Sequence, residues 1–118
     1  MPNPVTHFEI IGKDGKKLQD FYSKLFGWHI DANNPMNYGM VDTHTPGKGI
    51  GGGVMAAGPG DSNRTTFYVE VADLAAALKK AESLGGKTVI PPSDVPGGPK
   101  IAMFTDPEGN LIGLSTGM

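Results

Sequence analysis

The chain has 118 residues, the length of a single domain that can bury a core without disulfides or structural metals. It contains no cysteine, which excludes disulfides and thiolate metal sites, and its net charge of −2, with scattered basic residues, argues against nucleic acid as a partner. No apolar run approaches the length of a membrane span and the first residues lack a signal-peptide pattern, so we expect a cytoplasmic protein without membrane contact.

The first half of the chain predicts one strand, one helix and three further strands. Residues 5–11 alternate like a strand, and apolar residues then recur at helical spacing from Leu18 to Phe26. Asp14 stands where an N-cap is needed and Gly27 stands near the helix end. Short extended runs follow at residues 28–31, 37–41 and 50–55.

The second half repeats this order. Residues 65–71 predict a strand, and the helical spacing that follows runs from Leu74 to Leu84, with Asp73 as N-cap and Gly86 near the end. Three extended runs follow, at 88–90, 100–104 and 111–115, and residues 91–99 are predicted to be a Pro/Gly-rich loop between the first two.

A shift of 59 residues aligns the two halves, placing Asp14 on Asp73 and Gly27 on Gly86. We therefore predict an α+β fold of two tandem βαβββ modules in a single domain. Module one covers about residues 4–57, a linker residues 58–63, and module two about residues 64–118. Because so short a module is marginal alone, the modules should pack together or with modules of a second chain.

Two segments resemble a known family. Asp106-Pro107-Glu-Gly109-Asn predicts a tight turn between the last two strands, and residues 21–28 read Phe-Tyr-Ser-Lys-Leu-Phe-Gly-Trp. Both resemble the vicinal-oxygen-chelate superfamily, which includes glyoxalases, bleomycin-resistance proteins and extradiol dioxygenases. The resemblance implies curved sheets that enclose a cleft, and a homodimer.

The resemblance also implies four positions for metal ligands. Carried over to this chain, they fall on His7, Thr66, Gly113 and one residue of the Gly51–Gly53 run, where Gly113 replaces the glutamate of the metal enzymes. Only His7 is a suitable ligand type, and Glu9 lies two residues beyond it on the same strand face. The other histidines, His29 and His44, show no ligand spacing with His7. We therefore expect no cofactor, with a divalent metal at His7 as the alternative.

Strand parity selects the side chains that face the expected cleft. It predicts polar, aromatic and small residues there, and the candidate ligand-binding residues are His7, Tyr38, Met40, Thr66, Tyr68, Met103 and Gly113. The candidate catalytic residues are His7 and Tyr68. A lone histidine on a strand is more often a hydrogen-bonded structural side chain than a catalyst, and Tyr68 could equally cap the sheet. Arg64 is expected to be solvated or salt-bridged, and Trp28 to pack where the first helix ends.

Three functions remain open. The first is metal-independent binding of a small aromatic or amphipathic molecule, as the resemblance to the bleomycin-resistance branch implies. The second is an enzyme: a metal-dependent glyoxalase-like lyase, isomerase or dioxygenase that uses His7 and Glu9, or a cofactorless acid–base enzyme. The third is a subunit whose cleft is unused. The shortage of ligands favours the first.

Overall fold

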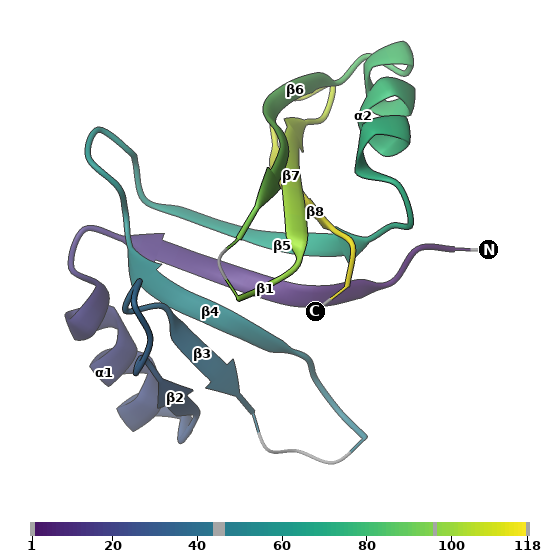
Figure 1. Ribbon diagram of the computed structural model, residues 1–118. Helices are drawn as coiled ribbons and strands as arrows, with labels where there is room; N and C mark the ends of the chain where they lie inside the picture. Colours follow the sequence, from purple (N-terminus) through teal and green to yellow (C-terminus); the bar gives the residue numbers. More distant parts are fainter. Residues whose placement is uncertain (1, 44–46, 96, 118) are drawn as a thin grey trace. The chain divides into compact units, whose positions relative to one another are not determined.

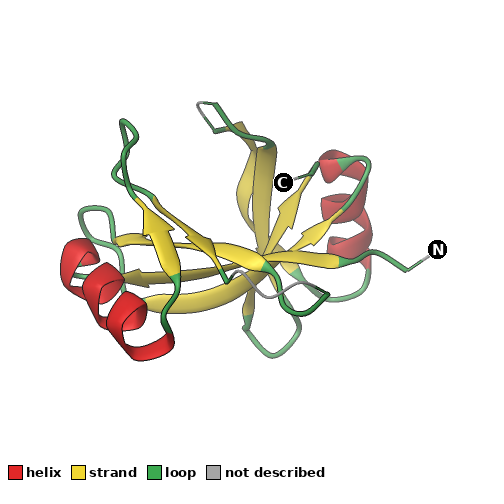
Figure 2. Cartoon of the chain, turned by 90° about the horizontal axis from the view of Figure 1, so that it is seen from below, coloured by secondary structure: helices red, strands yellow, loops and turns green. Residues whose placement is uncertain are grey.

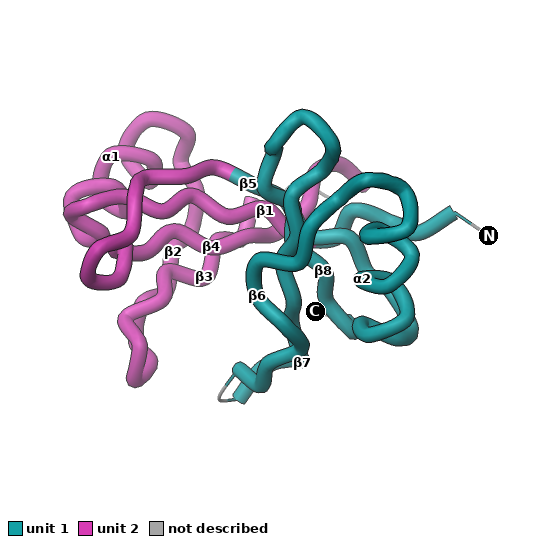
Figure 3. Tube along the Cα trace, turned by 90° about the horizontal axis from the view of Figure 1, so that it is seen from above, with its two compact units in different colours: residues 1–6, 66–118 teal, residues 7–65 magenta. Residues whose placement is uncertain are grey.

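The computed structural model describes residues 2–43, 47–95 and 97–117. These residues form eight strands and two helices, labelled in chain order in Figure 1 and coloured by type in Figure 2. The chain divides into two compact units, drawn in different colours in Figure 3. Residues 7–65 form the N-terminal unit, and residues 1–6 together with 66–118 form the C-terminal unit.

The N-terminal unit contains the first module. Its elements are β1 (Val5–Gly12, from residue 7 onward), α1 (Gly15–Phe26), β2 (His29–Asp31), β3 (Gly39–Asp42) and β4 (Gly51–Ala56). The strands follow the order β2-β3-β4-β1, in which β1 runs parallel to β4 and the other neighbours are antiparallel. The register places His7 opposite Gly51 and Glu9 opposite Gly53.

The C-terminal unit repeats this pattern. Its elements are β5 (Arg64–Glu70, from residue 66 onward), α2 (Leu74–Ser83), β6 (Lys87–Asp94), β7 (Lys100–Thr105) and β8 (Leu111–Ser115). The strand order is β5-β8-β7-β6, with β5 parallel to β8 and Tyr68 opposite Gly113. Both units therefore follow the βαβββ order, which confirms the predicted α+β class and the internal repeat.

Both helices begin at the predicted caps. The Asp14 carboxylate accepts a hydrogen bond from the Lys17 N–H at 3.0 Å, and the Asp73 carboxylate accepts one from the Ala76 N–H at 3.0 Å. Such bonds satisfy backbone donors that the first helical turn leaves without partners. Helix α1 ends at Gly27, whose φ of 70° is left-handed, while α2 ends two residues before the predicted Gly86, at Leu84.

Each helix packs on strands of its own unit. Leu74 and Leu78 of α2 bury against Ala102 of β7 and Leu114 of β8. At the end of α1, the Trp28 ring lies 5.6 Å from Tyr22 and 5.1 Å from Phe26, between ring centroids. Trp28 thus packs where the first helix ends, as the sequence predicts, and its ring also lies 5.3 Å from that of Phe8 on β1, between centroids.

The turn after β7 has the predicted geometry. The Asp106 carboxylate accepts hydrogen bonds from the backbone N–H groups of Glu108 and Asn110 and from the Asn110 side-chain amide, each at 2.9 Å. Gly109 takes a φ of 90°, a conformation that glycine adopts without steric cost. The side chain of one residue therefore organises the whole connection to β8.

Strand β6 is longer than predicted. The sequence predicts a strand only over residues 88–90 and a loop over 91–99, whereas β6 continues through Pro91 and Pro92 to Asp94. The strand lies at the edge of its sheet and pairs with one neighbour only, so the N–H groups that proline lacks are not needed for a second strand. Its register shifts on both sides of Ile90.

Among the described residues, no helix has the length and apolarity needed to span a membrane.

Candidate functional site

Four polar side chains of the N-terminal unit form a connected cluster, which we call the His7 cluster: His7, Glu9, Tyr38 and Arg64. His7 and Glu9 are alternate residues of β1 and point to the same face of the strand. The Tyr38 hydroxyl lies 2.8 Å from His7 Nε2 and donates to Glu9 Oε2 at 3.0 Å. Arg64 Nη2 lies 3.5 Å from the other Glu9 oxygen. The Tyr38 hydroxyl therefore joins a base to an ion-paired carboxylate.

Tyr38 reaches this position because its backbone is clamped. The Asn34 side chain accepts from the Tyr38 N–H at 2.9 Å and donates to the Tyr38 carbonyl at 2.7 Å. Asn37, the residue before, has a φ of 53°, and its carbonyl accepts a hydrogen bond from Gln19 at 3.2 Å. The short segment between β2 and β3 is thus shaped by side-chain amides, which are typical of tight turns.

The Tyr38 ring needs glycine beneath it. A Cβ at residue 53 would collide with Cζ and the hydroxyl of Tyr38. Gly53 therefore gives the ring room to approach β4 and β1 and places its hydroxyl between His7 and Glu9. Here glycine is required for close approach of a side chain to the backbone.

The number of protons on each group determines which members of the His7 cluster donate hydrogen bonds and which accept them. A phenol has one proton, and Tyr38 donates it to Glu9, which as an ion-paired carboxylate only accepts. His7 Nε2 must then donate to the Tyr38 oxygen, so a neutral imidazole carries its lone pair on Nδ1. Burial lowers the pKa of His7 below its ordinary value of 6.5, which favours the neutral imidazole at pH 7. His7 and Glu9 are only 5% and 7% exposed.

The C-terminal unit places a second tyrosine over a second glycine. A Cβ at Gly113 would lie 2.5 Å from Cδ2 of Tyr68, which is itself buried. The Thr66 hydroxyl donates to the Leu111 carbonyl at 2.7 Å, which ties β5 to β8. Met103 lies opposite Gly113 in the β7–β8 ladder and is 1% exposed. The structure therefore brings Tyr68 and Met103 together at Gly113, and Thr66 bonds to the first residue of the same strand, β8.

The register identifies which glycine of the Gly51–Gly53 run matches Gly113. Glu9 and Tyr68 correspond at the 59-residue shift, and their partners on the adjoining parallel strands are Gly53 and Gly113. The sequence alone left this choice open. Both of these matched positions are glycines covered by a tyrosine ring, Tyr38 in one unit and Tyr68 in the other.

Met40 is the remaining candidate ligand-binding residue of the N-terminal unit. Met40 lies opposite Gly53 in the β3–β4 ladder but is 51% exposed. His29 is exposed at the start of β2, and His44 lies outside the described residues. The sequence did not identify Arg64 as a site residue. It was expected to be solvated or salt-bridged, but Glu9 was not predicted as its partner.

The donor set does not suit a tightly held divalent metal. Within residues 2–43, 47–95 and 97–117, no three His, Cys, Asp or Glu side chains come together. Protein sites that hold such ions use at least three side-chain ligands in most cases. His7 and Glu9 are one pair, and both bond to the Tyr38 hydroxyl.

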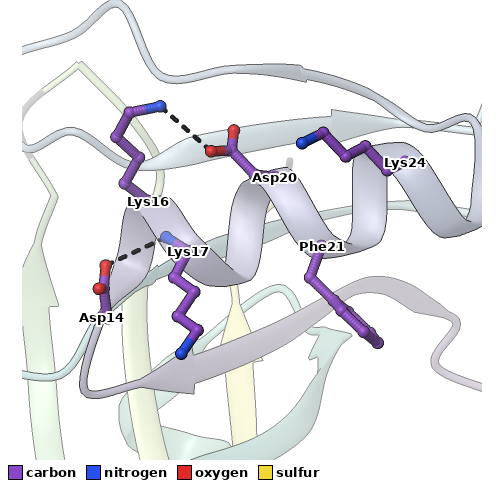
Figure 4. Close-up of a pocket in the computed structure, with 6 residues that line it drawn as sticks. All are labelled: Asp14, Lys16, Lys17, Asp20, Phe21 and Lys24. Atoms are coloured by element: carbon purple, nitrogen blue, oxygen red, sulfur yellow. Dashed lines mark hydrogen bonds and ion pairs between the residues drawn. The ribbon is translucent and has the colours of Figure 1, made fainter.

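A surface depression along α1 is a poorer candidate. It is lined by Asp14, Lys16, Lys17, Asp20, Phe21 and Lys24 (Figure 4). Its carboxylates already have partners, since Asp14 caps the helix and Asp20 pairs with Lys16 at 3.2 Å. Figure 4 shows Asp20 and Lys24 pointing away from Lys17 and Phe21, so the side chains do not converge on a ligand.

The tandem βαβββ order and the Asp106 turn define a glyoxalase-like domain. A family model described as the Glyoxalase/Bleomycin resistance protein/Dioxygenase superfamily matches residues 5–114, and the chain belongs to this family. Among solved structures, methylmalonyl-CoA epimerase from Mycobacterium tuberculosis superposes with a TM-score of 0.67 at 18% identity, over 97% of this chain and 87% of that one. At this identity the likeness shows the fold alone.

Curated relatives are similar in sequence. An anthracycline biosynthesis protein of Streptomyces peucetius is 28% identical over 92% of this chain and 45% of its own length. The chain therefore spans less than half of that relative. A glyoxylase-like domain-containing protein of Didymella fabae is 29% identical, over 95% of this chain and 92% of the relative.

Proposed function

We propose that this domain binds a small, aromatic or amphipathic molecule without a metal ion. The observation that carries the proposal is that Gly53 and Gly113, the two matched positions on β4 and β8, are each covered by a tyrosine ring. A carboxylate at either position would have to displace that ring. The space that a metal-binding side chain would need is therefore filled by aromatic surface, which suits apolar and aromatic ligands.

The kind of relative found supports a role with small molecules. The similar protein of Streptomyces peucetius is named for anthracycline biosynthesis, and the family description includes bleomycin resistance. Sequestration of such a compound requires binding and no chemistry. We propose the same for this chain, acting as a cytoplasmic homodimer with a small-molecule ligand and neither nucleic acid nor membrane as partner.

A thermal-shift screen in the presence of EDTA tests this function. A ligand that binds only the folded state raises the melting temperature by mass action. At a free ligand concentration of 100 times its Kd, the unfolding equilibrium constant falls about 100-fold. We expect planar aromatic compounds to raise the melting temperature equally with EDTA and with added zinc or nickel. A shift that requires the metal would refute metal-independent binding.

A second candidate, cofactorless proton transfer, is favoured by the His7 cluster. His7 has a pKa lowered by burial and bonds through Nε2 to the Tyr38 hydroxyl, and the neutral imidazole that burial favours is the form that acts as a general base. Tyr38 thereby takes the partner role that the sequence gave to Tyr68. Incubation of a bound ligand in D₂O would then exchange a ligand C–H, and His7→Gln would abolish the exchange. Unchanged exchange in His7→Gln would exclude His7 as the base.

A further inference from the structure

We propose that Tyr38 occupies, as an internal ligand, a binding site for a neutral phenolic ring. This inference rests on the proposed small-molecule function and names the chemical class of the ligand. Its elements are a flat floor at Gly53, a polar end at His7 and Glu9, and an occupant carried on a short connecting segment rather than on a helix or strand.

The floor of the site accepts a ring and excludes branched groups. Gly53 has no Cβ, and any Cβ there would collide with the distal atoms of the Tyr38 ring. The His7 imidazole lies nearly parallel to that ring, with an interplanar angle of 15° and 6.2 Å between centroids. Because the Tyr38 hydroxyl bonds to Nε2, the imidazole lies at the hydroxyl end of the ring and not over its face. A planar aromatic group therefore fits over Gly53 with its polar end at His7, whereas a bulky aliphatic group does not.

The polar end of the site matches a phenol. A phenolic hydroxyl offers one proton and accepts in return, which is the combination that Glu9 Oε2 and His7 Nε2 require at 3.0 and 2.8 Å. A carboxylate ligand would place a second negative charge beside Glu9, which is costly in a buried site. An unsubstituted arene would leave the buried Glu9 and His7 groups without the bonds they make to Tyr38. The recognised class is thus the neutral phenol.

The occupant can leave without breaking a strand. Tyr38 precedes the first residue of β3, and residues 32–38 belong to no helix or strand. Asn37 holds a left-handed φ of 53°, which is uncommon for a residue with a side chain. The Tyr38 hydroxyl donates one hydrogen bond to Glu9 and accepts one from His7, and the Asn34 side chain bonds to the Tyr38 backbone. A phenolic ligand can replace the ring by making the same two hydroxyl bonds, in competition with the covalently attached side chain.

Chemical rescue tests the site with a defined probe. Tyr38→Ala removes the phenol and opens a cavity, and p-cresol is the removed side chain as a free molecule. We expect p-cresol to raise the melting temperature of Tyr38→Ala by several degrees, and to raise it more than an equal concentration of toluene does. Wild type should bind p-cresol more weakly, because Tyr38 competes for the site. Tyr38→Phe is the matched control: it loses the hydroxyl bonds but keeps the ring, and should show no rescue.

Three results would overturn the inference: equal effects of p-cresol and toluene on Tyr38→Ala, an equal rise in Tyr38→Phe, or equal affinity in wild type. If Tyr38→Ala does not fold, Tyr38→Val keeps an apolar side chain and should show the same preference for p-cresol with a smaller shift. Metal-independent ligand binding in the thermal-shift screen, without a p-cresol preference in either variant, would reject the phenol site and leave the proposed function standing.

Discussion

At the residue scale, the role of His7 depends on its hydrogen-bond partner, Tyr38. Parity correctly places His7 and Glu9 on one face of β1, because alternation is a local property of the strand. Their joint partner Tyr38 is 31 residues from His7 in sequence and lies outside any regular element. No periodic signal connects Tyr38 to the strand. The sequence therefore identified His7 as a candidate site residue but could not predict the hydrogen bonds that form the His7 cluster.

The lowered pKa of His7 predicts a pH dependence of stability. Since folding depresses this pKa, the unfolded chain binds the proton more tightly, and the contribution of His7 is present above its ordinary value of 6.5 and lost as pH falls through the folded value. We expect the free energy of unfolding of wild type to fall below pH 6.5 more steeply than that of His7→Gln. Urea titrations from pH 8 to pH 5 measure this, and parallel curves would contradict it.

Gly53 should be intolerant of any side chain because of Tyr38. Gly53→Ala forces the ring away from His7 and Glu9, and overpacking of this kind costs about 1–3 kcal/mol of unfolding free energy. The control is the same substitution in a Tyr38→Ala background, where the cost should nearly vanish. A double-mutant cycle by denaturant unfolding measures the coupling. Additive costs would show that residue 53 is constrained by something other than the ring.

At the element scale, local signals account for most of what was predictable. Asp14, Asp73 and Asp106 were each identified from short-range chemistry, and each side chain makes the backbone bonds expected of it. Strand β6 was mispredicted because its prolines are typical of loops. Whether proline is tolerated depends on which neighbour a strand pairs with, and an edge strand tolerates it. Edge position is a property of the sheet and cannot be read from a single segment.

The Asp106 turn should be sensitive to acid. Hydrogen bonds, foremost from Asn110, hold the pKa of Asp106 below its ordinary value of 3.8, so its contribution is present above pH 3.8 and lost as pH falls through the lower folded value. At pH 7 we expect Asp106→Ala to lower the melting temperature more than Asp106→Asn, which keeps an acceptor oxygen. The gap between wild type and Asp106→Asn should narrow in acid. A gap that stays constant from pH 7 to pH 2.5 would contradict the charged-turn account.

At the scale of the whole molecule, the internal repeat allowed the βαβββ order to be predicted, because each half of the chain could be checked against the other.

Exposed apolar side chains lead to a prediction about assembly. Among the described residues, the large hydrophobic side chains that remain exposed in the single chain are Val5, Phe21, Leu25, Phe26, Met36, Met40, Phe67, Leu84 and Val89. Three of these residues, Phe21, Leu25 and Phe26, share α1, and exposed apolar side chains that lie together are typical of an interaction surface.

We therefore expect a homodimer in solution. Sedimentation equilibrium at micromolar concentration should give twice the mass of the 12.3 kDa chain. Because burial of apolar surface is the expected driving force, the dimer should persist when the salt concentration is raised, which screens surface charges. A monomer at every concentration would refute the prediction, and a dimer that dissociates in salt would refute its apolar basis.

Metal content tests the central claim, metal-independent binding, most directly. We expect protein purified without a histidine tag to carry far less than one equivalent of zinc, iron, manganese or nickel by elemental mass spectrometry. That content should be the same in wild type and His7→Gln, since the described residues do not assemble a donor set. About one equivalent of a divalent metal in wild type, lost in His7→Gln, would contradict the account.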